Sequence, residues 1–145
     1  MYATQSDMVQ RFGASELLHL TDPTGSGTVD GSLLDLALTD ATGEVDSYLS
    51  MVLTAPLTVP TARVVSVTCD IARYRLYALA GGEPEQVQER YDAAIRWLRD
   101  VAKGSAKLGV EPPAGEAPAL GSALAATPRT MVLDSAAAAY QGIVP

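Results

Sequence analysis

The segment from residue 61 to residue 80 constrains the fold most, because a helix formed by it would be apolar around most of its circumference. At about 3.6 residues per turn, its apolar side chains form two stripes instead of one. Thr61 is a suitable N-cap, and Gly81 with Gly82 ends the pattern. Such a helix packs on several neighbours, so we predict the central helix of a bundle. The stripes are Val64, Val67, Ile71, Tyr74 and Ala78, and Val65, Cys69, Ala72, Leu76 and Leu79.

Two further segments have the spacing of amphipathic helices. The first begins at a cap, Asp30 or Ser32, and the second has Pro84 in its first turn and stops at Gly104. The segment TAPLTVP before the central helix contains two prolines, which predict an extended crossing. The apolar stripes are Leu34, Leu38, Ala41, Val45, Tyr48 and Val52 in the first helix, and Val87, Tyr91, Ala94, Leu98 and Val101 in the second.

Both ends of the chain differ from this body. Thr4 and Asp7 have the spacing of a capping box, which predicts a short helix that ends at Gly13, and Ser15 opens another short turn. From Gly109 to residue 128 the chain has four prolines and no aromatic residue, too little apolar surface to fold alone.

We therefore expect an all-α protein. Its first domain, residues 1–108, is a small bundle of three main helices plus short N-terminal helices. Residues 109–145 are an extended, Ala/Pro-rich C-terminal arm. The arm contains one short β-prone run, which is Thr130, Met131, Val132 and Leu133.

The net charge of −7 is confined to the first 60 residues, which hold eight acidic residues and one basic residue, while the rest holds nine of each. This charge argues against a DNA-binding footprint. It suits docking on a basic partner or a passage that DNA must not adhere to, and a solvated face is the plainer alternative. The candidate acidic face is Asp22, Asp30, Asp35, Asp40, Glu44 and Asp46.

A polar stripe on the central helix is the candidate subunit interface. It contains Arg63, Asp70, Arg73 and Tyr77, and we add the β-prone run at residues 130–133 as a strand for a partner's sheet edge. Arg and Tyr are enriched at protein interfaces, and the acidic chain makes a nucleic-acid surface the weaker reading. Arg75 shares a face with Thr68 and Ile71, so if that face is buried its guanidinium needs an acidic partner from another segment.

We expect no catalytic group, no metal and no cofactor. The loop at residues 22–33 fits a calcium-loop template only in part, because Leu33 stands where a bidentate Glu is needed, so a plain turn capped by Asp22 and Asp30 is preferred. His19, the single histidine, reads as a partly buried packing residue, and Cys69 reads as a small buried hydrophobe.

No stretch approaches the roughly 18 apolar residues of a membrane span, and the first residues do not have the pattern of a secretory signal. We expect a protein made and kept in the cytoplasm.

The order of these segments resembles the phage Mu-type head-tail connector proteins. The resemblance covers about residues 1–109 and rests on MYATQSDMVQRFGASELLHLTD, VDGSLLDLAL, ATGEVDSYL, the crossing with its two prolines, CDIARYRLY and ERYDAAIRWLRDVAKGSAKLG. The C-terminal arm departs from the family pattern. The resemblance implies an all-α, non-enzymatic head-completion protein in the virion neck, assembled in the bacterial cytoplasm.

As such a protein, it would form a ring of about twelve copies below the portal protein. It would also contact a tail terminator or stopper protein and let the genome DNA pass without sequence-specific binding. The alternative is a small cytoplasmic helical binding module, calcium-responsive through residues 22–33.

Overall fold

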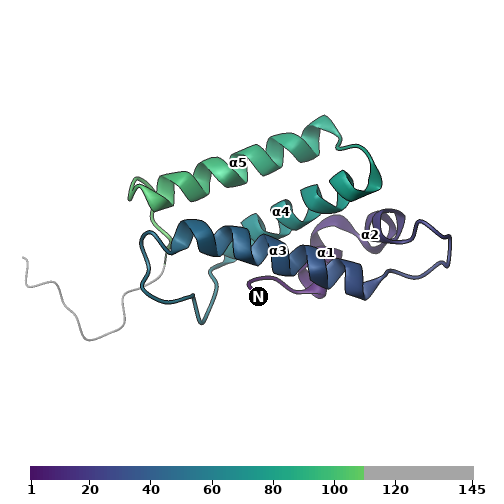
Figure 1. Ribbon diagram of the computed structural model, residues 1–145, viewed down its shortest axis with the longest axis horizontal. Coiled ribbons are helices and arrows are strands. Elements are labelled where there is room, and N and C mark those ends of the chain that lie inside the picture. The colour runs from purple at the N-terminus through teal and green to yellow at the C-terminus, as the bar shows by residue number, and fades with distance from the viewer. Residues whose placement is uncertain (110–145) are drawn as a thin grey trace, which may run out of the picture. The chain divides into compact units, whose positions relative to one another are not determined.

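The computed structural model describes residues 1–109, which belong to one compact unit (Figure 1). These residues form five helices and no strand, so the predicted all-α class is confirmed. Within them, no helix has both the length and the apolar content needed to cross a membrane. The predicted C-terminal arm lies outside the described residues. The helices are α1 (Gln5–Phe12), α2 (Ala14–Thr21), α3 (Gly31–Leu49), α4 (Ala62–Ala80) and α5 (Glu85–Ala102).

The helix ends follow the capping residues of the sequence. Thr4 and Asp7 form both halves of the capping box of α1. The Asp30 side chain accepts hydrogen bonds from the first backbone amides of α3, and Thr61 does the same for α4. Gly81 ends α4 at a φ of 98°, a left-handed conformation that glycine adopts without strain. The predicted starts of these three helices are confirmed.

Helix α4 is central, as its two apolar stripes predict. It contacts each of the other four helices, and α3, α4 and α5 run side by side in alternating directions (Figure 1). The short helices α1 and α2 pack on α4, and α1 also packs on α3. The α4 residues that form the core are Val64, Val67, Cys69, Ile71, Ala72 and Leu76.

Three details differ from the sequence expectations. The first long helix ends at Leu49, so Val52 lies beyond it and is exposed. The apolar stripes of α4 do not stay buried to the end, because Leu79 in the last turn is exposed. Pro84 is the N-cap of α5 and not a first-turn residue. In the first two cases the apolar pattern continues past the point where neighbouring helices cover it. Pro84 has the extended backbone of a cap, with φ −60° and ψ 145°, so the helix begins at Glu85.

The N-terminal segment is tied to the bundle by Tyr2, which is buried. Its hydroxyl donates a hydrogen bond to Asp46 of α3 and accepts one from the backbone amide of Leu57 in the crossing segment. One side chain therefore joins the start of the chain, α3 and the α3–α4 connection.

Candidate functional site

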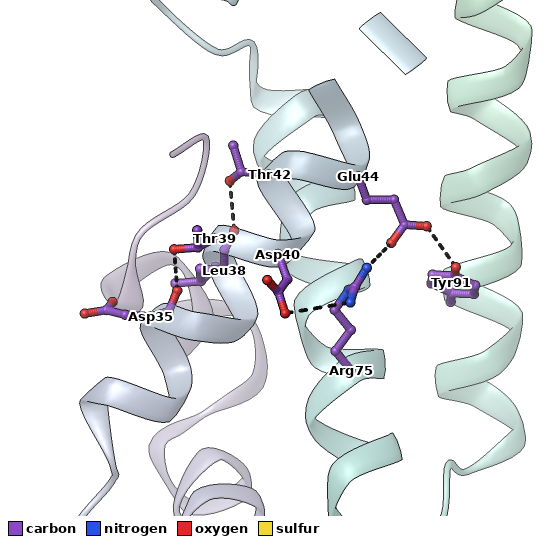
Figure 2. A network of polar contacts seen from close by, with 8 residues as sticks. All are labelled: Asp35, Leu38, Thr39, Asp40, Thr42, Glu44, Arg75 and Tyr91. Atoms are coloured by element: carbon purple, nitrogen blue, oxygen red, sulfur yellow. Dashed lines mark hydrogen bonds and ion pairs between the residues drawn. The ribbon is translucent and has the colours of Figure 1, made fainter. Parts of the chain in front are cut away.

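Glu44 of α3 joins the three long helices through its carboxylate (Figure 2). One oxygen accepts a hydrogen bond from Nη2 of Arg75 on α4 at 2.8 Å, and the other accepts one from the hydroxyl of Tyr91 on α5 at 2.9 Å. Asp40, one turn earlier on α3, lies 3.8 Å from Nη1 of Arg75. The prediction that Arg75 needs an acidic partner from another segment is confirmed.

Tyr91 acts in this network as a neutral donor. Burial, followed by its hydrogen bond to Glu44, raises the pKa of Tyr91 to about 12. Its ring stacks on that of Tyr74 from α4, with ring centroids 4.1 Å apart and planes inclined by 15°. The aromatic pair and the hydrogen bond together fasten α5 to α3 and α4.

A second fastening joins the N-terminal helices to α4. Arg73 forms two hydrogen bonds with Glu16 of α2, from Nε at 2.6 Å and from Nη2 at 3.1 Å. Its guanidinium also lies 4.5 Å from the ring centroid of Phe12 at the end of α1. The side chains of Arg73 and Glu16 are only 13% and 23% exposed. This bidentate pair is therefore largely withdrawn from solvent.

Four arginines lie near the carboxyl group of Asp70 on α4, and Arg90 is the one in contact with it. Arg90 of α5 approaches it to 3.5 Å, and Arg11 of α1 donates a hydrogen bond to Ser66 at 3.2 Å. The Asp70 side chain is only 17% exposed, and burial raises the pKa of its carboxyl against the opposing effect of the nearby positive charges. We call this set the arginine cluster; it comprises Arg11, Arg63, Arg73 and Arg90 around Asp70.

The four predicted interface residues of the central helix share this side of α4. The guanidinium carbon of Arg63 lies 5.3 Å from the ring centroid of Trp97, and that of Arg73 lies 5.8 Å from the ring centroid of Tyr77. Asp70 and Arg73 have the carboxylate and guanidinium partners described above. All four therefore have partners within the chain, and a subunit contact through them stays a prediction. The remaining predicted interface residues, Thr130, Met131, Val132 and Leu133, lie outside the described residues.

The six residues of the predicted acidic face lie in three different places. Asp22 and Asp30 belong to the α2–α3 loop and cap backbone amides. Asp35 and Asp46 lie on the side of α3 where they contact Gln5 and Tyr2. Asp40 and Glu44 lie on the side that faces Arg75. The sequence treats the six as one group, whereas the geometry separates them; their role in a channel stays a prediction.

The α2–α3 loop is a capped turn, as preferred from the sequence. The two carboxylate oxygens of Asp22 accept hydrogen bonds from the backbone amides of Ser26 at 2.8 Å and Gly27 at 2.7 Å. These bonds lower the pKa of Asp22. Among residues 1–109, no three His, Cys, Asp or Glu side chains are grouped so that they could hold a metal ion.

The single cysteine and the single histidine differ in burial. Cys69 is fully buried, as predicted, and burial raises the pKa of its thiol to about 12. His19 is exposed, so the expectation of a partly buried packing residue is wrong. The reason is that α2 buries Leu17 and Leu20, and His19 lies on the other side of this short helix.

Sequence reasoning missed the partners of Arg73 and Asp70. Glu16 and Arg90 lie on different helices from Arg73 and Asp70, so no local spacing relates them. The rule that a buried guanidinium needs a carboxylate would have pointed to them, as it does for Arg75. Arg73 belongs to a polar stripe in the sequence, and nothing in that stripe indicates that its guanidinium is buried.

The fold and these sites define a class: a small all-helical protein whose charged side chains fasten its helices to one another. Comparison with known proteins gives the family. The family described as "Bacteriophage Mu, Gp36" matches residues 2–126.

Two phage-related proteins are similar to most of the chain. Gene product J of Escherichia phage Mu is 33% identical over 111 residues, which are 76% of this chain and 77% of that protein. The Mu-like prophage FluMu protein gp36 of Haemophilus influenzae is 29% identical over 110 residues, with the same coverage of both chains. The chain therefore belongs to the phage Mu Gp36 family, and the resemblance inferred from its sequence is confirmed.

Proposed function

We propose that this protein is a structural head-tail connector of a tailed phage or phage-like particle. In this role it forms a ring below the portal protein, joins the DNA-filled head to the tail and lines the channel through which the genome passes. Its work is assembly and not catalysis. The observation that carries the proposal is the match to the phage Mu Gp36 family over residues 2–126.

The arrangement of polar side chains supports a structural role. The Glu44 network joins three long helices, and the Arg73–Glu16 pair holds the N-terminal helices on α4. Networks of this kind specify one rigid arrangement of the helices they connect. A subunit that transmits force between a head and a tail needs such a body.

The acidic character of the chain supports passage of DNA without adhesion. The net charge of −7 disfavours phosphate contacts, so DNA could slide past the ring without being retained. The proposed protein partners are further copies of the chain, the portal protein and a tail terminator or stopper protein. The proposed location is the virion neck, after assembly in the bacterial cytoplasm.

The calcium-responsive binding module receives less support. Both carboxylate oxygens of Asp22 already accept backbone hydrogen bonds within the α2–α3 loop. A bound calcium ion would have to compete with these bonds and would find Leu33 at the position of the bidentate ligand.

Disruption of the gene in the phage or prophage that encodes this chain tests the proposal. We expect DNA-filled heads and separate tails in the lysate, and joined particles again when the wild-type chain is supplied in trans. Joined, infectious particles without the protein would contradict a connector role. Missing capsids would also contradict it, because a connector acts after the head is built.

A further inference from the structure

The arginine cluster gives this acidic protein a basic surface. Arg11 and Arg63 are exposed, and neither forms an ion pair within residues 1–109. The Arg90 side chain is 55% exposed, whereas its partner Asp70 is only 17% exposed. The arginine donors therefore face outward, while the carboxylate that compensates them is mostly covered.

Two other carboxylates near the cluster are already engaged. Glu16 is taken up by both nitrogens of Arg73. Asp7 accepts hydrogen bonds from the backbone amide and hydroxyl of Thr4 in the capping box. The exposed guanidinium groups of Arg11, Arg63 and Arg90 therefore retain donors for an external anionic group.

Helix geometry places this surface opposite α3. Arg73 and Arg75 are two residues apart on α4, so their side chains point about 200° apart around the helix axis. Arg75 points to Glu44 and Asp40 of α3, and Arg73 points to Glu16 of α2. The arginine cluster therefore lies on the side of α4 that faces away from α3, where α4 meets α1, α2 and α5.

The outer side of α3 is acidic. Asp35 and Asp40 are exposed at its two edges, about 140° apart around the helix axis, and Leu36 between them is 55% exposed. Asp35 accepts a hydrogen bond from Gln5 at 2.8 Å, and Asp40 lies 3.8 Å from Arg75 with its side chain still 51% exposed. We call Asp35, Leu36 and Asp40 the α3 acidic patch.

The α3 acidic patch therefore combines an apolar side chain with two carboxylates. The arginine cluster combines apolar and positively charged surface, because Arg63 lies over the ring of Trp97.

We propose that the arginine cluster of one copy of this chain binds the α3 acidic patch of a second copy. The inference rests on the proposed function, because it names the contact that would build the ring. Two different, complementary surfaces on opposite sides of α4 give a head-to-tail contact, which closes into a ring when the rotation between copies allows it. Charge complementarity favours a second copy over DNA, because the chain as a whole repels phosphates.

A pair of charge-reversed variants tests this contact. The first carries Arg11→Glu and Arg63→Glu, and the second carries Asp35→Lys and Asp40→Lys. Each variant alone would place like charges across every contact of a ring. In an equal mixture, an alternating ring would have opposite charges across every contact. The control variant carries Arg96→Glu and Arg99→Glu, because both arginines are exposed and form no ion pair in the part of the chain described.

Ring formation is measured by sedimentation velocity and native mass spectrometry, with and without the portal protein. We expect each reversed variant to lose about tenfold or more in association, the mixture to recover wild-type association, and the control to be unchanged. Circular dichroism checks that each variant is folded. If Asp40→Lys unfolds the protein by disturbing Arg75, Thr39→Lys replaces it, because Thr39 is exposed and only its hydroxyl bonds the local backbone.

Three results would overturn the inference. One is a wild-type protein whose copies do not associate even with the portal protein. Another is rings that both reversed variants form normally. The last combines two observations. The wild type binds a 30-base-pair DNA duplex, and the variant with Arg11→Glu and Arg63→Glu loses this binding but still forms rings. Incorporation into purified particles is scored separately, so a failed contact is distinguishable from a failed connector role.

Discussion

Removing the Glu44 carboxylate with Glu44→Ala tests the network that joins the three long helices. The substitution removes the acceptor for Arg75 at 2.8 Å and for Tyr91 at 2.9 Å. Hydrogen bonds that involve a charged group contribute about 1.5–3 kcal/mol each when they are shielded from solvent. The Arg75 side chain is 39% exposed and can regain water, so its share is smaller. We expect the free energy of unfolding to fall by about 2–3 kcal/mol.

Thermal unfolding followed by circular dichroism at 222 nm measures this effect. For a folded body of this size, about 2–3 kcal/mol corresponds to a decrease in Tm of roughly 8–12 °C. Glu89→Ala is the matched control, because Glu89 is an exposed helical glutamate for which a change within about 0.5 kcal/mol is expected. Combining Glu44→Ala with Tyr91→Phe should give less than the sum of the two single effects. Equal stability of Glu44→Ala and Glu89→Ala would show that the Glu44 carboxylate does not stabilise the bundle.

Three further predictions follow from buried groups. Arg73→Ala should lower the free energy of unfolding by about 2–4 kcal/mol in urea titrations, because it leaves the mostly buried Glu16 without its partner; an effect no larger than that of Arg96→Ala would contradict this. The raised pKa of Tyr91 means that its contribution to stability is complete below pH 10 and is lost as the pH rises towards 12. The free energy of unfolding of Tyr91→Phe, measured in urea, should therefore fall less between pH 10 and pH 12 than that of the wild type. An equal fall in both proteins would show that Tyr91 ionises freely in the folded protein. Cys69 should react with a thiol reagent only as fast as the protein unfolds, and rapid labelling of the native protein would show that its thiol is accessible.

The helices could be predicted from the sequence because local rules determine them. Thr4, Asp30 and Thr61 cap the helices they precede, and the double apolar stripe of residues 61–80 belongs to the central helix. Burial at the ends of the helices could not be predicted as well. The exposure of Val52 and Leu79 depends on where the neighbouring helices stop, and that is a property of the assembled bundle.

The polar contacts could be predicted only in part. The need of Arg75 for an acid follows from its position on an apolar face, but the choice of Glu44 depends on the packing of α3 against α4. The pairing of Arg73 with Glu16 brings together residues 57 positions apart, and no periodic pattern contains that information. Arg73 therefore has a structural role within the chain, and Arg63 is the better position at which to probe a contact between subunits.

Electron microscopy of the protein mixed with the portal protein of its own particle shows whether this chain joins head and tail. We expect rings of this chain bound to one end of the portal, with a continuous channel through both. Monomers that do not bind the portal, at concentrations where the portal ring is intact, would contradict the connector role.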